Sequence, residues 1–508
     1  MSRDVRRVTK EYIKGKVIDP VRTSLTFDDL TLYPDFSRVG PKEINTETLL
    51  TKGGENKKEI KLKIPLVSAA MDTVTEKELA IALALAGGIG IIHKNLRLEE
   101  QASQVKSVKR WMNSVISDPI YTNKEVSVGE VKEVMKSKKI SGLPVLDKND
   151  NLCGIITNRD VSSCKNDNLK VKEVMTSQVI CAGEEMKEEE AQKIMLENRV
   201  EKLPIKTKDG KLAGMFTAVD IKKRQQHPEA VLDENKRLLV GAAVGDIWHK
   251  HKARVEALVE AGVDVIVIDT AHGHTVNMKN MLTKMAEFYP KIPVIAGNIS
   301  TPEAVKDLVK WGADAIKVGQ GPSAICTTRV VAGIGIPQMT AIMEAVAVAG
   351  EVPVIADGGI KYSGDIVKAI AGGASSVMIG SLFSGTDEAP GEIIYHQGKS
   401  YKIYRGMGSS GAMKEGSAER YRQEGQPEHK FVAEGIEGNI SYAGTMASVV
   451  YQLIGGLRSG MGYCGCEIIK ELKEKARFRI VTGSGLRESH PHDINIIREE
   501  ENYRGGVR

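Results

Sequence analysis

The chain has 508 residues, of which 41% are hydrophobic and 27% charged, as expected for a soluble globular protein of about two to four domains or one large domain with an insertion. Its 71 basic and 66 acidic residues leave a formal charge of +5 without a basic stripe, so no clear nucleic-acid site is expected. The longest apolar run, Leu79 to Ile92, is too short to span a bilayer, and the charged N-terminus lacks a secretory apolar core. Because of that short run, no membrane association is expected. Six cysteines without a disulfide pattern favour a reducing, cytoplasmic setting.

Eight short apolar segments recur along the chain, each ending in glycine or a small polar residue. Nearly continuous Val, Ile and Ala runs are typical of strands buried on both faces of a parallel sheet. Helical patterns lie between most of them, and the one at 301–312 opens with Thr301, Pro302 and Glu303, a good start signal. This alternation favours an α/β fold, a (β/α)8 TIM barrel, with a doubly wound open sheet as the alternative. The expected strands are 64–71, 87–95, 238–245, 264–273, 293–298, 315–321, 352–359 and 376–381.

An internal repeat fills the gap of roughly 150 residues between the second and third expected strands. At an offset of 60 residues, Met135 matches Met195, and each copy runs helix, strand, charged turn, strand, helix. The repeat resembles a tandem pair of cystathionine-β-synthase-type (CBS) modules. That resemblance implies adenine or guanine nucleotides as ligands, with the Thr and Asp of each G-x-x-T-x-x-D motif on the ribose; a purely structural pair is the alternative. These residues are Thr157 and Asp160 in the first copy, and Thr217 and Asp220 in the second.

The domain limits follow from the repeat. We expect an inserted tandem CBS (Bateman) domain at 113–228, and a catalytic barrel formed by 1–112 and 229–508. A second insertion, 385–443, follows the last strand and is rich in Gly, Ser, Glu and Lys. Loops this long inside a compact domain are usually functional or disordered, so we expect a mobile flap over the active site.

Closing the barrel would place every strand-end cluster on one rim, where the active site of this fold is found. The glycines of Asp357-Gly358-Gly359 and the pair Gly380-Ser381 follow the last two strands, the usual phosphate-binding position. A phosphorylated substrate is therefore expected.

Cys326 lies in a glycine-rich turn directly after the strand that ends near Val318. A thiol there is either a nucleophile, once deprotonated, or a small buried hydrophobic group. Gly319, Gly321 and Ala324 spell G-x-G-x-x-A, but no helix opens on these glycines and no acidic residue closes the next strand, so we exclude a Rossmann-type dinucleotide site.

Most of the chain resembles the inosine-5′-monophosphate (IMP) dehydrogenase family. The matching pieces are SAAMDTVTE, DTAHGH, GNI, ICTTR, ADGGI, GS, YRGMGS, ERY, EGIEG and ESHPHD, within 25–95, 230–345, 350–445 and 480–495, and the repeat matches the family's usual CBS insertion. The resemblance implies oxidation of IMP to XMP by NAD⁺ and water, the committed step of guanine nucleotide synthesis. Cys326 would add to C2 of the purine and hydride would leave to NAD⁺. Arg420, beside Tyr421 and with Thr328, would then activate the water that releases XMP.

The resemblance also implies three sets of ligand contacts and a homotetramer, with pairing of tetramers into octamers left open. Substrate contacts would come from Met71, Ala324, Asp357, Gly358, Gly359, Gly380, Ser381, Tyr404, Arg405, Gly406, Met407, Gly408 and Glu434. NAD contacts would come from Asp269, Thr270, Ala271, His272, Asn298, Gly319, Gln320 and Gly321. A potassium ion would be held by carbonyls of Gly319, Gly321 and Cys326, with Glu488, Ser489 and His490 of a neighbouring copy of the chain.

The chain departs from the family pattern at two adjacent positions, and there are two alternatives to the dehydrogenase function. The family usually reads G-x-G-P-G-S-I-C, whereas this chain has Ser323 and Ala324 in the Gly-Ser positions. Losing a hydrogen bond to a charged group costs about 1.5–3 kcal/mol, so we expect a raised KM for IMP unless Ser323 compensates, and strain if position 323 needs a glycine conformation. GMP reductase shares the barrel and cysteine but lacks the Arg-Tyr loop. A catalytically inactive nucleotide-sensing scaffold is opposed by the intact Cys326, Thr328 and Arg420.

Overall fold

The computed structural model describes residues 23–54, 57–112, 116, 119–138, 140–497 and 500–503. The chain divides into two compact units: 1–83, 87–105 and 240–508 form one, and 84–86 and 106–239 form the other. The first 22 residues of the predicted catalytic domain and residues 113–115 of the predicted insertion lie outside the described residues. Across the described part of the chain, no helix combines the length and apolar character needed to cross a membrane.

The first unit is built on a closed barrel of eight parallel strands, which confirms the (β/α)8 prediction and excludes the open sheet. Each of the eight expected segments supplies one strand. Closure depends on β5 pairing with β12, where Ile91 faces Gly241, although the inserted unit separates the two strands in sequence. In spatial order the strands are β12 (Gly241–Val244), β13 (Val265–Asp269), β14 (Val294–Ile299), β15 (Ala315–Val318), β16 (Val354–Asp357), β17 (Ser376–Ile379), β4 (Leu66–Ser68) and β5 (Ile89–Ile92).

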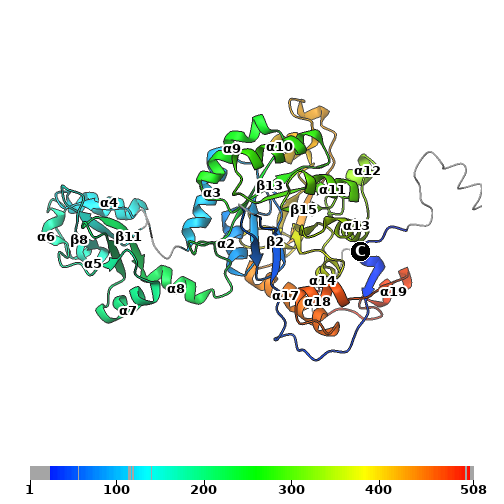
Figure 1. Cartoon of the computed structure of the whole chain (residues 1–508), viewed down its shortest axis with the longest axis horizontal. Helices are drawn as coiled ribbons and strands as arrows, with labels where there is room; N and C mark the ends of the chain where they lie inside the picture. Colours follow the sequence, from blue (N-terminus) through cyan, green and yellow to red (C-terminus); the bar gives the residue numbers. More distant parts are fainter. Residues whose placement is uncertain are drawn as a thin grey trace, which may run out of the picture. The chain divides into compact units, whose positions relative to one another are not determined.

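Helices surround the strands, as Figure 1 shows for α9, α10, α11, α13 and α14. Three later helices follow the barrel, and two short pairs of strands, β1 (Leu30–Leu32) with β21 (Phe478–Ile480) and β2 (Thr48–Thr51) with β3 (Ile60–Leu62), complete the unit. The helices are α2 (Lys77–Leu85), α3 (Leu98–Trp111), α9 (Trp248–Glu260), α10 (Val276–Phe288), α11 (Pro302–Lys310), α12 (Thr328–Val331), α13 (Gln338–Ala349), α14 (Ser363–Ala371), α15 (Ser381–Ser384), α17 (Met446–Tyr463), α18 (Ile469–Lys475) and α19 (Gly483–Glu488).

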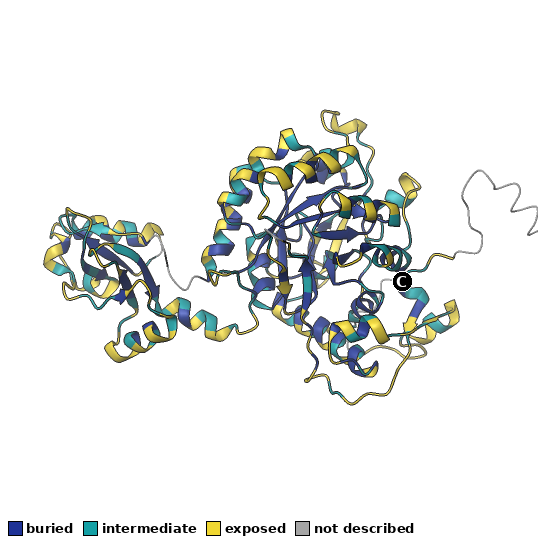
Figure 2. Cartoon of the chain, in the orientation of Figure 1, coloured by how far each residue is buried: buried dark blue, intermediate teal, exposed yellow. Residues whose placement is uncertain are grey.

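The strands form the core because both of their faces are covered, and almost all of their residues are buried (Figure 2). The apolar runs that predicted them are explained by this double burial. One strand breaks the pattern: β15 reads Ala-Ile-Lys-Val, and its Lys317 is only 1% exposed. A fully buried lysine needs partners for its charge, and these lie in the site described below.

The inserted unit repeats one arrangement of elements twice. The first copy contains β6 (Thr122–Asn123), α4 (Val128–Lys138), β7 (Gly142–Leu146), β8 (Leu152–Thr157) and α5 (Asn158–Ser163), with α6 (Val171–Val174) after it. The second contains β9 (Ala182–Gly183), α7 (Glu188–Asn198), β10 (Lys202–Lys206), β11 (Leu212–Thr217) and α8 (Ala218–Gln226). Leu143 pairs with Ile156, and Leu203 with Phe216, so the offset of 60 residues holds in the strand register.

The Thr and Asp of each repeat bond to one another at the start of a helix. Thr157 Oγ1 donates to Asp160 Oδ2 at 2.8 Å, and Thr217 Oγ1 donates to Asp220 Oδ2 at 2.5 Å. These pairs stabilise the first turns of α5 and α8, which is the structural alternative raised from the sequence. The nucleotide-binding role stays a prediction.

The insertion 385–443 contains regular structure. Its three antiparallel strands are β18 (Ile394–His396), β19 (Lys399–Arg405) and β20 (Glu437–Ser441). The turn between β18 and β19 is the two residues Gln397 and Gly398, both with positive φ (48° and 74°), as a tight hairpin of this twist requires. Between β19 and β20 lie α16 (Ser410–Lys414) and two short 3₁₀ helices, η2 (Ser417–Tyr421) and η3 (Glu428–Lys430).

The residues that start α11, Thr301 and Pro302, are expected to stabilise the barrel unit. Thr301 caps the helix, its hydroxyl accepting from Ala304 N at 3.3 Å, and Pro302 occupies the first turn. We expect Thr301→Ala to lower the free energy of unfolding of the barrel unit by about 1 kcal/mol, measured by urea denaturation with tryptophan fluorescence. Thr283→Ala is the control, since its exposed hydroxyl bonds to Lys279 O and caps nothing. An equal loss in both variants would contradict the capping role.

Candidate active site

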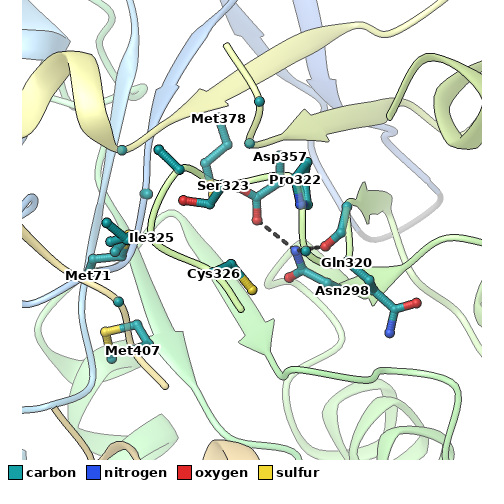
Figure 3. A pocket seen from close by; sticks show the side chains of 18 of the residues that line it. Met71, Asn298, Gln320, Pro322, Ser323, Ile325, Cys326, Asp357, Met378 and Met407 are labelled. Atoms are coloured by element: carbon teal, nitrogen blue, oxygen red, sulfur yellow. Dashed lines mark hydrogen bonds between the residues drawn. The ribbon is translucent and has the colours of Figure 1, made fainter. Parts of the chain in front are cut away.

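A cavity of about 310 Å³ lies at the carboxyl ends of the barrel strands. It is lined mainly by residues in, or directly after, the ends of β4, β13, β14, β15, β16 and β17, together with the flap residues 404, 406–408, 420–421 and 434. In Figure 3, Cys326 stands between Met71, Ile325 and Met407 on one side and Asn298 and Asp357 on the other. The rim predicted from strand ends is therefore a real concavity.

Most of the predicted site residues line this cavity. They are Met71, Asp269, Ala271, Asn298, Gly319, Gln320, Gly321, Ala324, Cys326, Thr328, Asp357, Gly358, Gly359, Gly380, Ser381, Tyr404, Gly406, Met407, Gly408, Arg420, Tyr421 and Glu434. The remaining predicted residues have other surroundings.

Six predicted residues do not line the cavity. Thr270 Oγ1 donates to Gly297 O at 2.9 Å, and His272 Nδ1 lies 3.1 Å from Gln320 Nε2. The guanidinium of Arg405 is paired with Asp72 at 2.8 Å. Glu488, Ser489 and His490 lie at the end of α19, where Ser489 Oγ donates to Gly485 O and His490 Nδ1 lies 3.1 Å from Tyr503 Oη.

The turn that carries Cys326 is fixed by main-chain hydrogen bonds to the flap. Thr327 N donates to Glu434 O at 2.9 Å, and Ile436 N donates to Ile325 O at 3.0 Å, forming a small antiparallel bridge. Cys326 Sγ lies 3.2 Å from Thr328 Oγ1. The thiol, a hydroxyl and the flap are thus held together, an arrangement that suits covalent chemistry at sulfur followed by attack of water.

Lys317 lines the cavity but was not among the site residues predicted from the sequence. Its Nζ lies 2.9 Å from Asp269 Oδ1 and 2.7 Å from Asp357 Oδ2, and it also donates to Asn298 Oδ1. Asn298 Nδ2 in turn donates to Asp357 Oδ2 at 2.8 Å (Figure 3). The signal that could have found it was a lysine inside an otherwise apolar barrel strand, since buried lysines are almost always paired.

Two side chains of the flap helix η2, Arg420 and Glu419, hold it to the barrel. Arg420 pairs with Asp269 Oδ2, while Glu419 lies 3.3 Å from Lys94 Nζ and 2.9 Å from His251 Nε2. Burial raises the pKa of Glu419, but the hydrogen bond from His251 and the charge of Lys94 outweigh it and lower that pKa to about 2. Glu419 is therefore ionised at neutral pH and anchors the segment that presents Arg420 and Tyr421.

Gly358, Gly359, Gly380 and Tyr404 line the predicted anion-binding end of the cavity. Gly358 and Gly359 have φ of 90° and 83°, so the chain turns there in a conformation that favours glycine. A Cβ on Gly380 would lie 2.7 Å from Tyr404 Oη, so no side chain fits at that position. Burial raises the pKa of Tyr404 to about 12, with a hydrogen bond from Ser323 opposing it, so the phenol stays neutral and can donate.

Ser323 is not among the residues with positive φ, so position 323 does not need a glycine conformation and the conditional strain does not arise. The Ser323 side chain lines the cavity and lowers the pKa of Tyr404 against the effect of burial. Ala324, beside it, is exposed.

The predicted potassium site would use the main-chain carbonyl oxygens of Gly319, Gly321 and Cys326. Gly319 O accepts a hydrogen bond from Asn298 Nδ2 at 2.7 Å, so one of the three predicted carbonyls already has a partner within the cavity. Within the described residues, no group of three or more His, Cys, Asp and Glu side chains is arranged to hold a metal ion.

The chain is similar to known proteins over nearly its whole length. A family model described as "IMP dehydrogenase / GMP reductase domain" matches residues 24–492. The inosine-5'-monophosphate dehydrogenase of Aquifex aeolicus is 53% identical over 489 residues, covering 95% of this chain and 98% of that protein. That of Methanocaldococcus jannaschii is 52% identical over 499 residues, covering 96% and 99%.

A solved structure with the same fold is a GMP reductase variant from Trypanosoma brucei in complex with guanosine 5'-monophosphate. It superposes with a TM-score of 0.85 at 39% sequence identity, and the match covers 94% of this chain and 99% of that one. Both the family model and the relatives span nearly the whole chain. The chain therefore belongs to the IMP dehydrogenase/GMP reductase family.

Proposed function

We propose that this chain oxidises IMP to XMP with NAD⁺ and water. The observation that carries the proposal is the grouping of Cys326, Thr328, Arg420 and Tyr421 around one cavity that ends in an anion-binding surface. The relatives named inosine-5'-monophosphate dehydrogenase, at about half identity over nearly the whole chain, favour this activity over GMP reduction.

In the proposed first step, the Cys326 thiolate forms a bond to C2 of the hypoxanthine ring, and the hydrogen on C2 leaves as hydride. NAD⁺ supplies the acceptor for that hydride. In the second step, water adds to C2, the bond to Cys326 Sγ breaks and XMP is released, with one proton left over. Dividing the reaction this way replaces one difficult step by two easier ones.

Arg420 and Thr328 are the proposed groups that remove the proton from water. Arginine ordinarily has a pKa above about 12, so it needs close confinement and a hydroxyl partner to act this way. Tyr421 supplies part of that confinement: it is buried, and burial raises the pKa of its phenol. A Cβ added to Gly408 would lie 2.7 Å from the Tyr421 ring, so the ring packs directly against the flap backbone at residue 408.

We propose that Asp357 holds the ribose of IMP and Asp269 the ribose of NAD⁺. Asp269 Oδ1 is taken by Lys317, whereas Oδ2 is paired with Arg420. A ribose diol would need the oxygen that Arg420 uses here. The flap 385–443 would therefore have to move off the barrel for NAD⁺ to bind and return for hydrolysis, which is the proposed reason for its mobility.

We also propose a potassium site in a homotetramer, a nucleotide-binding domain and a cellular compartment for this chain. Carbonyls of Gly319, Gly321 and Cys326 are the proposed half of a potassium site, completed by residues 488–490 of a second copy in a homotetramer. Residues 113–228 are proposed as an inserted CBS-type domain that binds adenine or guanine nucleotides, and the cytoplasm as the compartment. Assays with and without potassium test the first of these.

GMP reductase is the second candidate, because the solved structure compared above is one. It would consume NADPH with GMP, whereas the proposed activity produces NADH from IMP and NAD⁺. A catalytically inactive scaffold would do neither, so one absorbance assay for the reduced cofactor separates the three.

Replacing the nucleophile tests the first step. We expect Cys326→Ala to reduce NADH formation by more than about 1,000-fold while IMP still binds, as measured by calorimetry, because the phosphate and ribose contacts remain. Cys164→Ala, in the inserted unit, is the control and is expected to retain the wild-type rate. Wild-type turnover by the Cys326 variant would refute covalent catalysis.

Replacing the proposed water-activating group tests the second step. We expect Arg420→Ala to release about one equivalent of NADH rapidly and then to turn over about 100-fold more slowly, because the purine remains bound to sulfur. Stopped-flow absorbance measures both phases. Arg422→Ala removes a neighbouring, half-exposed arginine paired with Asp246 and should lack the burst. A slow variant without any burst would place Arg420 before hydride transfer instead.

Restoring a serine at position 324, at the anion-binding end, tests whether a hydroxyl there contributes to the binding of IMP. Ala324→Ser should lower the KM for IMP about tenfold, because it adds a hydroxyl near the substrate phosphate. Ala332→Ser, on the exposed residue after α12, is the matched control. Unchanged KM for the 324 variant would indicate that Ser323, bonded to Tyr404, already supplies that contact.

A further inference from the structure

The side chain of Lys317 enters the cavity from the middle of the barrel and is 2% exposed. An ammonium has three N–H donors, and all three have acceptors here: Asp269 Oδ1, Asp357 Oδ2 and Asn298 Oδ1. Each donor of this buried group therefore has an acceptor, as a buried ammonium requires. Its position is fixed by contacts to three different strands, β13, β14 and β16, so it is rigid.

The three partners belong to the two halves of the proposed site. Asp269 ends β13 on the side where Arg420 docks, and Asp357 ends β16 beside Gly358 and Gly359 at the anion-binding end. One ammonium therefore touches a carboxylate from each half. The backbone is fitted to this contact, since a Cβ on Gly297 of β14 would lie 2.7 Å from the Cβ of Lys317.

We propose that Lys317 is a positioning residue that joins the two ligand subsites, holding Asp269 and Asp357 at a fixed separation for the two riboses. The inference rests on the proposed function, which assigns one carboxylate to each ligand. Lys317 touches Asp269 through one oxygen only, so Asp269 keeps its place whether Arg420 or a ribose occupies the other oxygen.

The charges around Lys317 show which carboxylate depends on it most. Asp269 has a second cation, Arg420, from η2 of the flap. Asp357 pairs with Lys317 and otherwise accepts from the neutral amide of Asn298. The other titratable groups that line the cavity are Cys326, Arg329, Lys361, Tyr404, Tyr421 and Glu434. Removing the ammonium would therefore leave Asp357 buried beside Asp269 without the cation that holds it in place.

The test is Lys317→Met, which keeps the length of the side chain and removes the charge. We expect KM to rise about tenfold or more for both IMP and NAD⁺, with a smaller change in kcat.

The matched control is Lys109→Met. Lys109 is a buried lysine in the inserted unit, 2.9 Å from Asp233 and from Leu238 O, with a side chain that is 3% exposed. It should lose stability without changing either KM. A folded Lys317→Met with both KM values within about twofold of wild type, or with only one of them raised, would overturn the joining role.

If Lys317→Met does not fold, Lys317→Arg replaces it. A planar guanidinium keeps the charge but cannot direct three N–H groups from one nitrogen, so both KM values should rise. Unchanged constants in that variant overturn the proposal equally. Calorimetric titration with IMP and with NAD⁺ needs no turnover, so it tests Lys317 even if the wild-type chain makes no NADH, a result that would refute the proposed function alone.

Discussion

The site exists because the barrel closes. Pairing of β5 with β12 and of β17 with β4 brings the carboxyl ends of eight strands to one rim. The residues at those ends are up to some 300 positions apart in sequence, yet they line one cavity. Without closure, Met71 after the first barrel strand would not share a cavity with Cys326 after the sixth strand in chain order or with Gly380 after the last. Double burial of the strands supplies the apolar driving force for closure.

Two insertions are accommodated without disturbing this barrel. One forms a separate compact unit between β5 and β12. The other extends the chain after β17 and returns to the rim, where its main chain bonds to the turn that carries Cys326. Because the contacts between that turn and the flap are main-chain hydrogen bonds, they depend on the small residues Gly406, Gly408 and Gly435, at which a Cβ would lie 3.2 Å or less from neighbouring backbone or ring atoms.

Charge organises the interior of the cavity. Two carboxylates, Asp269 and Asp357, face one buried ammonium and, from the flap, one guanidinium. The two cations differ in how they are held: Lys317 is fixed within a barrel strand, whereas Arg420 belongs to a short 3₁₀ helix that Glu419 anchors through Lys94 and His251. Because Lys317 contacts Asp269 independently of the flap, that carboxylate would keep a cation beside it without Arg420.

The sequence by itself determined the barrel strands, the start of α11 at Thr301, the repeat at an offset of 60 residues and most of the residues that line the cavity, because strand periodicity, capping and strand-end glycines are local patterns. Tertiary structure alone decided the rest. The docking of Glu419, the pairing of Arg405 with Asp72 and the bridge between Cys326 and Gly435 join segments far apart in sequence, which no local pattern encodes. Lys317 shows the limit most clearly: its strand was predicted, but its role depends on which acceptors three other strands bring within reach of one nitrogen.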